Sequence, residues 1–217
     1  MIGFFFSMYM KKAKKQHQKI PSMKSIQKRN CDLLIEDKPV EPPYPIRLPY
    51  QEVKVGFGRG SSDLNCPTAN IDIPKDNDDL NKNLPTGVYF GFCKLRPNSH
   101  NLDSCKQKRV QNDNSEVEIN KGIYLKEECK IDLKLPCVLS IGYNITYDDN
   151  KIKSRSLEVH VLEKFEHKFY GAEMQLTILG YIRPEIKYNS LDELIDGIET
   201  DKLVATEVLT WDSFKDI

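Results

Sequence analysis

The stretch Leu157-Glu158-Val159-His160-Val161 alternates aliphatic and polar side chains without a break. Successive side chains of an extended strand point to opposite faces, so this pattern buries one face and leaves the other in water. The same two-residue period recurs in four other short apolar runs, at Val53-Val55-Phe57, Ile71-Ile73, Val88-Phe90-Phe92 and Met174-Leu176-Ile178. Short alternating runs separated by turn residues indicate an antiparallel sandwich or barrel.

The segments around these runs lack the two-residue period. Residues 37–49 contain five prolines, which indicates an extended lead-in to a folded domain that starts near Tyr44. Residues 94–135 are dense in Asn, Asp, Glu, Lys and Ser, which predicts a polar surface insertion. A capping box at 190–193 precedes apolar residues at helical spacing, so one helix, broken near Gly197, is expected to close the domain.

The composition excludes several classes of protein. Lys and Arg total 32, and so do Asp and Glu, so no net field draws the chain toward nucleic acid. The six cysteines contain no C-x-x-C pair, and their spacing fits neither a zinc site nor a disulfide framework. We therefore expect reduced cysteines in a monomeric, cytoplasmic protein whose partners are small molecules rather than nucleic acids.

The first 43 residues form a basic, Pro-rich extension that we expect to be disordered. Its apolar start, residues 2–10, is too short to cross a bilayer, which takes about 20 residues. The lysines follow this apolar run, whereas a secretory signal places its positive charge before it. Three alternatives stay open: an unstructured tail, a mitochondrial presequence, and a peripheral contact with a membrane surface.

The segment Gly56-Phe57-Gly58-Arg59-Gly60-Ser61 carries three glycines at alternate positions and is soon followed by Pro67-Thr68-Ala69-Asn70. Glycines let backbone N–H groups turn toward a bound anion. The spacing matches neither a Walker A loop nor a dinucleotide fingerprint, and a tight hairpin or bulge explains it as well. Thr68 and Asn70 project to the same side of an extended segment, as a hard cation such as Mg²⁺ prefers, although both could simply hydrogen-bond a turn.

Glu158 and His160 share the polar face of the 157–161 strand. A carboxylate beside a substrate hydroxyl can orient it and take its proton during phosphoryl transfer. The solvated face of an ordinary strand is the commoner explanation of such a glutamate. Glu158 by itself therefore does not decide the chemistry.

Six motifs occur in one order along the chain. They are G-F-G-R-G-S with P-T-A-N, T-G-V-Y-F-G at 86–91, S-I-G-x-N at 140–144, E-V-H at 158–160, F-Y-G at 169–171 and G-Y-I-R-P-E at 180–185. Together they resemble the riboflavin kinase family, and most of all its fungal members, from about Tyr44 to Leu209 outside the insertion. The resemblance implies an all-β fold, a six-stranded antiparallel Greek-key barrel with a carboxy-terminal α-helix. It also implies transfer of the γ-phosphoryl group of ATP to the 5′-hydroxyl of riboflavin, giving FMN and ADP.

The resemblance further implies roles for single residues. Glu158 matches the catalytic carboxylate, and Thr68 and Asn70 match the ligands of Mg²⁺, with Zn²⁺ or Mn²⁺ as alternatives. The positions expected at ATP are Gly56, Gly58, Gly60, Ser61, Ser62, Thr68, Val161, Glu163 and Tyr170. The positions expected at the flavin are Arg183, Ile186 and Tyr188. Residues 140–154 match a mobile flap over the site.

This chain departs from the family pattern at a few positions. Asn65-Cys66 stands where Gly-Ile commonly precedes P-T-A-N, and Gly142-Tyr143-Asn144-Ile145 stands where the flap commonly reads G-W-N-P. Ser62, Glu163 and Ile186 are not the commonest residue types at their positions, so only backbone or shape contacts carry over there. None of these changes touches the matched metal ligands or the carboxylate.

Two other classes of protein stay open at this point. A flavin-binding or carrier protein that has lost catalysis would keep the same barrel, although the intact Thr68, Asn70 and Glu158 oppose it. A small barrel that binds single-stranded nucleic acid is opposed by the balanced charge and by the lack of an aromatic–basic stripe. An additional domain that adenylylates FMN is not expected, because the chain before Tyr44 is too short for one.

Overall fold

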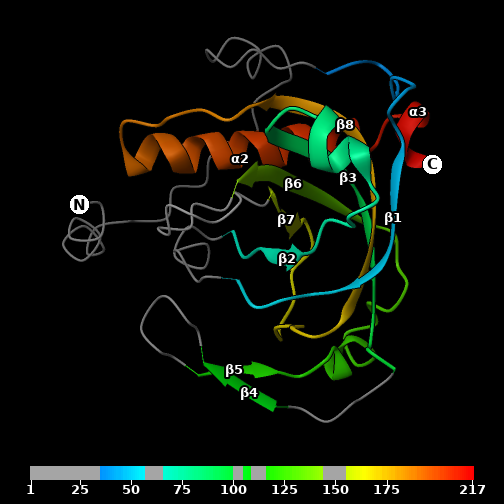
Figure 1. Cartoon of the computed structure of the whole chain (residues 1–217), viewed down its shortest axis with the longest axis vertical. Helices are drawn as coiled ribbons and strands as arrows, with labels where there is room; N and C mark the ends of the chain where they lie inside the picture. Colours follow the sequence, from blue (N-terminus) through cyan, green and yellow to red (C-terminus); the bar gives the residue numbers. More distant parts are fainter. Residues whose placement is uncertain (1–34, 57–65, 100–104, 109–115, 144–154) are drawn as a thin grey trace.

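Strands make up most of the regular structure (Figure 1). The computed structural model describes residues 35–56, 66–99, 105–108, 116–143 and 155–217. The strands in these ranges are β1 (Ile46–Glu52), β2 (Ala69–Ile71), β3 (Gly87–Arg96), β4 (Cys105–Lys108), β5 (Glu116–Ile119), β6 (Leu135–Tyr143), β7 (Arg155–Val161) and β8 (Glu173–Pro184). The helical elements are η1 (Asp79–Asn83), η2 (Ile123–Leu125), α2 (Leu191–Val208) and α3 (Asp212–Lys215).

Six of these strands form one antiparallel sheet in the order β1-β8-β3-β6-β7-β2. β3, β6 and β7 run as a meander, while β8 returns beside β3 and β2 lies beside β7, which is a Greek-key arrangement. The two edges of the sheet meet at one antiparallel bridge, where the Lys54 N–H donates to the Asn70 carbonyl at 2.8 Å. The sheet therefore curls into a partly closed barrel, and the predicted fold class is confirmed.

The interior of the curled sheet is one hydrophobic core. Side chains at alternate positions of the strands fill it, among them Leu48, Tyr89, Leu139, Leu157, Val159 and Leu176. Because Leu157 and Val159 point inward, the side chains between and after them, Glu158 and His160, point outward. The alternation read from the sequence thus decides which face of β7 can hold chemistry.

A second core lies between the outer face of the sheet and the carboxy-terminal helices. It joins Phe90, Val138, Leu179 and Ile182 of the strands to Val204, Ala205, Val208 and Phe214 of the helices. The rings of Phe90 and Phe214 meet edge to face with centroids 5.3 Å apart. The predicted run Val88-Phe90-Phe92 is therefore a strand whose alternating residues face α2, while Tyr89 and Cys93 face the barrel interior.

Helix α2 runs without interruption from Leu191 to Val208, so the expected break near Gly197 is wrong. Ser190 is the N-cap as predicted, since its hydroxyl accepts from the Glu193 N–H at 3.1 Å. The Glu193 carboxylate accepts from the Asn189 N–H at 2.9 Å, one residue before the position that a capping box uses. Gly197 serves packing instead. A Cβ added there would lie 2.2 Å from the hydroxyl oxygen of Tyr188, so only glycine lets this ring lie against the helix.

The first strand lies earlier than the sequence pattern predicts. β1 begins inside the Pro-rich lead-in and ends just after it. In the described part of the run that begins at Val53, Val53 joins the core and Val55 does not, while Phe57 lies outside the described residues. Pro49 is tolerated because β1 is an edge strand paired only with β8, and because its register shifts between Leu48 and Gln51. Proline occurs in sheets mainly at such edges and bulges.

The polar stretch 94–135 carries more regular structure than its composition indicates. Its first three residues continue β3, and Leu95 is fully buried. β4 and β5 pair as a separate hairpin that projects from the barrel (Figure 1). Leu125 belongs to the barrel core, so the chain after this hairpin packs back against the domain.

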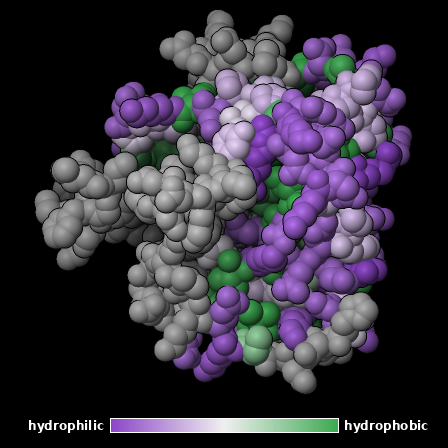
Figure 2. Space-filling view, in the orientation of Figure 1, coloured by the Kyte–Doolittle hydropathy of each residue, from purple (hydrophilic) through white to green (hydrophobic). Residues whose placement is uncertain are grey.

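The surface in Figure 2 is mostly hydrophilic, with small apolar areas between charged side chains. No helix in the described part of the chain is long and apolar enough to cross a membrane. Residues 1–34 lie outside the described residues, so the expected roles of the amino-terminal extension stay predictions.

A buried ion pair ties α2 to the sheet. Nε and Nη2 of Arg183 donate to the two carboxylate oxygens of Asp201 at 2.8 and 2.6 Å, and both side chains are almost fully buried. Burial raises the pKa of Asp201, and the hydrogen bonds from Arg183 oppose that rise. Such a pair adds little net stability, but removing one partner leaves a buried charge without compensation.

Replacing Asp201 by Ala is expected to lower the free energy of unfolding by about 3 kcal/mol, because the buried Arg183 would lose its carboxylate. Urea unfolding followed by circular dichroism measures the loss. Glu207→Ala, at an exposed position of the same helix, is the matched control and should change the free energy by less than about 0.5 kcal/mol. Equal stability of Asp201→Ala and the wild type would contradict this role.

Candidate active site

Pairing of β2 with β7 brings three predicted site residues together. Asn70 lies directly opposite Glu158 in the antiparallel register, and directly opposed side chains share a face of the sheet. The Thr68 hydroxyl, just before β2, donates to Oε2 of Glu158 at 3.4 Å. The predicted metal ligands and the predicted carboxylate therefore converge on the outer face of the barrel.

The chain after β1 passes over this group. A Cβ added to Gly56 would lie 2.4 Å from Nδ2 of Asn70, so the glycine allows a close approach that any larger residue would disturb. The predicted phosphate-side loop thus begins in contact with the predicted metal site. Its other predicted residues, Gly58, Gly60, Ser61 and Ser62, lie outside the described residues.

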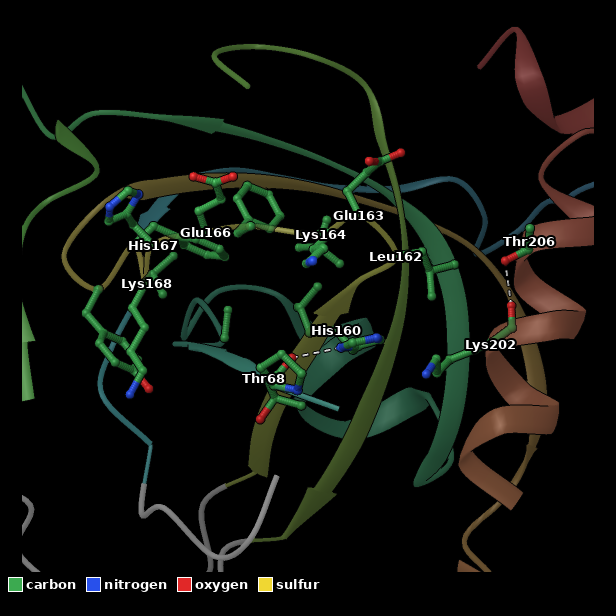
Figure 3. Close-up of a pocket in the computed structure, with 18 of the residues that line it drawn as sticks. Thr68, His160, Leu162, Glu163, Lys164, Glu166, His167, Lys168, Lys202 and Thr206 are labelled. Atoms are coloured by element: carbon green, nitrogen blue, oxygen red, sulfur yellow. Dashed lines mark hydrogen bonds between the residues drawn. The ribbon is translucent and has the colours of Figure 1, made fainter. Parts of the chain in front are cut away.

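A cavity of about 830 Å³ opens beside the Thr68 hydroxyl (Figure 3). It lies between the start of β2, the end of β7, the loop of residues 162–170 and one face of α2. Four residues predicted at ATP line it: Thr68, Val161, Glu163 and Tyr170. Glu158 does not line the cavity itself, and its contact with Thr68 places it at the margin. The volume is typical of small-molecule sites.

Several basic residues of this cavity were not predicted from the sequence. Lys164 and Lys168 come from the loop, and Lys202 reaches in from α2, as Figure 3 shows. Nζ of Lys202 lies 2.7 Å from Oε1 of Glu199, with 19% of the lysine side chain exposed. Helical spacing identifies the faces of α2 but not which surface each face covers, so no sequence signal could have assigned Lys202 to the cavity. The lining also contains Glu163, Glu166 and Glu199, so its three lysines and three glutamates balance in formal charge. The lysines therefore offer single contacts for phosphate oxygens rather than a net positive field.

His160 anchors the segment that carries Thr68. Its Nδ1 lies 2.8 Å from the Pro67 carbonyl, and because a carbonyl can only accept, the ring nitrogen carries the proton. Burial lowers the pKa of His160, and the Lys202 ammonium lowers it further. The hydrogen bond to the Pro67 carbonyl opposes this lowering. The imidazole is therefore neutral at pH 7 and serves as a structural donor.

Of the residues predicted at the flavin, Arg183 lies near the end of β8, and Ile186 and Tyr188 lie on the segment between β8 and α2. Arg183 is buried with Asp201, and its guanidinium carbon lies 5.8 Å from the centroid of the Tyr188 ring. Tyr188 is partly buried, whereas Ile186 is exposed. The structure thus brings Arg183 and Tyr188 together. The flap residues 144–154 lie outside the described residues.

The donor set at Thr68, Asn70 and Glu158 fits a hard divalent cation. It offers a hydroxyl, an amide and a carboxylate oxygen, the ligand types that Mg²⁺ shares with nucleotide phosphates. Among the described residues, no group of three or more His, Cys, Asp or Glu side chains could hold a metal ion. The five described cysteines form no disulfide. Oxygen ligands for a cation, a carboxylate and a neighbouring cavity that contains lysines are the parts that phosphoryl transfer from a nucleotide requires.

Comparisons with known proteins point to the same class of enzyme. The family model described as "Flavokinase: Riboflavin kinase" matches residues 43–209. The riboflavin kinase of Kluyveromyces lactis is 45% identical over 185 residues, which cover 83% of this chain and 92% of that protein. The riboflavin kinase of Scheffersomyces stipitis is also 45% identical over 185 residues, which cover 85% of this chain and 95% of that protein.

A solved structure of riboflavin kinase from Trypanosoma brucei aligns with 77% of this chain and 82% of its own, at 21% identity and a TM-score of 0.49, too low to add to the argument. The family model and the two fungal relatives establish the family by themselves. The chain belongs to the riboflavin kinase family. The family and the enzyme class predicted from the ordered motifs are confirmed.

The lowered pKa of His160 predicts a dependence of stability on pH. An imidazole in the unfolded chain binds a proton below about pH 6.5. The folded protein resists that proton, so the free energy of unfolding should fall as the pH falls from about 6.5 toward the lower folded pKa. His160→Asn keeps a donor for Pro67 but does not titrate, so its free energy of unfolding should fall less than that of the wild type between pH 7.5 and 5.5. Identical losses in urea unfolding would contradict this assignment.

Proposed function

We propose that this chain transfers the γ-phosphoryl group of ATP to the 5′-hydroxyl of riboflavin, giving FMN and ADP, with Glu158 as the base. Phosphorylation of riboflavin with ATP as co-substrate is the activity of the family to which the chain belongs. One observation carries the residue assignment: the Thr68 hydroxyl, the Asn70 amide and the Glu158 carboxylate meet at the margin of the cavity.

Glu158 suits the role of base because of its neighbours. The β2–β7 pairing holds its backbone, and the Thr68 hydroxyl donates to one carboxylate oxygen, Oε2. The carboxylate can then accept the proton of a substrate hydroxyl through its other oxygen. Phosphoryl transfer depends mainly on positioning and on neutralising charge. A carboxylate held on a rigid sheet orients the riboflavin hydroxyl in line with the transferred group.

We propose Mg²⁺ as the divalent cation, with Zn²⁺ or Mn²⁺ as alternatives, held by Thr68 and Asn70. Because the Thr68 hydroxyl hydrogen is directed at Glu158, the oxygen lone pairs remain available for a cation. When bound, the ion would neutralise charge on the nucleotide phosphates. Two neutral ligands suit an ion that keeps waters and shares phosphate oxygens.

The two substrates would occupy different parts of the molecule. For ATP we propose the 830 Å³ cavity, with Val161, Glu163 and Tyr170 in its wall and Gly56 to Ser62 on the phosphate side. For the flavin we propose the segment 183–188, where exposed Ile186 and the ring of Tyr188 offer apolar surface. Arg183 would act there through the backbone it holds, since its guanidinium is bound to Asp201.

The alternative of a catalytically inactive flavin carrier predicts a different site. A protein that only binds flavin has no need for a carboxylate beside paired oxygen ligands, nor for lysines in a separate cavity of the size that a nucleotide fills. Thr68, Glu158 and Lys202 supply these features in this chain. Flavin binding without consumption of ATP would favour the alternative.

Glu158→Gln is expected to reduce kcat by about 100-fold or more, because an amide cannot take the proton of the riboflavin hydroxyl. FMN formation measured by chromatography in the presence of riboflavin and MgATP gives kcat and both KM values. Glu118→Gln, an exposed glutamate of β5, is the matched control and should behave as the wild type. Near-normal turnover by Glu158→Gln would remove this residue from its role.

Gly56→Ala tests whether Asn70 binds the cation, because Gly56 contacts the Asn70 side chain. The added Cβ would press on the Asn70 amide, so the Mg²⁺ concentration needed for half-maximal activity should rise by about 10-fold. Titration of activity with Mg²⁺ at fixed ATP measures it, and Thr68→Val should shift it in the same direction. An unchanged metal requirement in both variants would contradict the assignment of Thr68 and Asn70.

A further inference from the structure

The loop of residues 162–170 forms one wall of the cavity, and every residue in it is part of the lining. This loop follows the end of β7 and contains no helix or strand. Its backbone therefore lacks the hydrogen bonds that a sheet or helix would provide. Such a wall keeps its shape only if groups outside the cavity form hydrogen bonds with its backbone N–H and C=O groups.

The carboxylate of Glu128 supplies part of that support. It accepts from the N–H of Glu166 at 3.3 Å and from the N–H of His167 at 3.1 Å. It also lies 3.1 Å from Nδ1 of His167, and 11% of its side chain is exposed. A carboxylate that receives neighbouring backbone donors makes charge-assisted hydrogen bonds, which are stronger than neutral ones.

Residues shortly before Glu128 in the chain hold the second half of the loop. Asn120 is buried; its amide donates to the Lys168 carbonyl, and its oxygen accepts from the Gly122 N–H at 3.0 Å. The Lys121 N–H donates to the Tyr170 carbonyl at 2.8 Å. The Tyr124 ring stacks on His167 with centroids 4.2 Å apart.

Lys130 completes the support at the start of the loop. Its Nζ lies 3.0 Å from Oε2 of Glu163, one of the residues proposed at ATP. Residues 120–130 therefore contact the loop at several positions between Glu163 and Tyr170. These eleven residues belong to the polar stretch that the sequence had suggested was a mere surface insertion.

We propose that residues 120–130 hold the cavity wall in the shape that binds the nucleotide, and that Glu128 is the main positioning residue for ATP. The inference rests on the proposed function of the cavity as the ATP site. The loop presents Glu163 and Tyr170 to the cavity while Glu128 binds the backbone between them. Without that carboxylate, Glu166 and His167 could move, and ATP binding would have to order them. The conformational entropy lost in that ordering would weaken the binding of ATP.

The proposal predicts a change confined to one substrate. The flavin segment 183–188 is held by β8, by the Asp201 ion pair and by Gly197, none of which belongs to residues 120–130. Glu128→Ala should therefore raise the KM for ATP by about 10-fold, while kcat and the KM for riboflavin stay within about 2-fold. A role in general folding would alter all three values together or lower the amount of folded enzyme.

Steady-state kinetics of the full chain with both substrates varied provides the test. Glu128→Gln keeps one acceptor oxygen and should show a smaller rise in the KM for ATP. Glu127→Ala, the exposed neighbour, is the matched control and should leave all values unchanged. An unchanged KM for ATP in folded Glu128→Ala, or an equal rise for riboflavin, would overturn the proposal.

Hydrogen exchange of the wild type gives a second readout that does not depend on a variant folding. A non-hydrolysable ATP analogue should slow amide exchange in residues 162–170 and in residues 120–130 together. Slowing in the loop alone would contradict the coupling. If the analogue slows exchange in neither segment, the cavity is not the ATP site, and if the wild type makes no FMN, the proposed function fails by itself.

Discussion

The pairing of β2 with β7 is the constraint on which the rest of the site depends. β2 is only three residues long, yet its register sets Asn70 opposite Glu158 and brings Thr68 within reach of the carboxylate. The same strand receives the Lys54 bridge that draws the two edges of the sheet together. A shift of one residue in this register would turn Asn70 into the core, because side chains alternate between faces.

The barrel divides its outer face between packing and chemistry. α2 and α3 cover β3, β6 and β8 and complete the second core around Phe90 and Phe214. The outer faces of β2 and β7 stay clear of that core, and one face of α2 borders the cavity beside them. The helix thus contributes both to stability and to the site, and the buried Arg183–Asp201 pair keeps it in place.

The support of the cavity wall shows why a segment of unremarkable composition can matter. Residues 120–130 contain few apolar side chains, and their contribution is made through polar contacts with the backbone of another loop. Such contacts need donors and acceptors in register across a long separation in sequence. In energetic terms they replace the ladder hydrogen bonds that the 162–170 loop lacks.

The order of the motifs and the two-residue period were enough, from sequence alone, to predict the barrel, the carboxy-terminal helix, the family, and an outward-facing Glu158. These features are local, since alternation and capping depend on neighbours in the chain. Only the tertiary structure could decide the position of β1, the unbroken α2, the pairing of Arg183 with Asp201, the entry of Lys202 into the cavity and the contacts of Glu128. Each of these depends on contacts between elements that lie far apart in the sequence. No repeating pattern of side chains specifies which elements pack together.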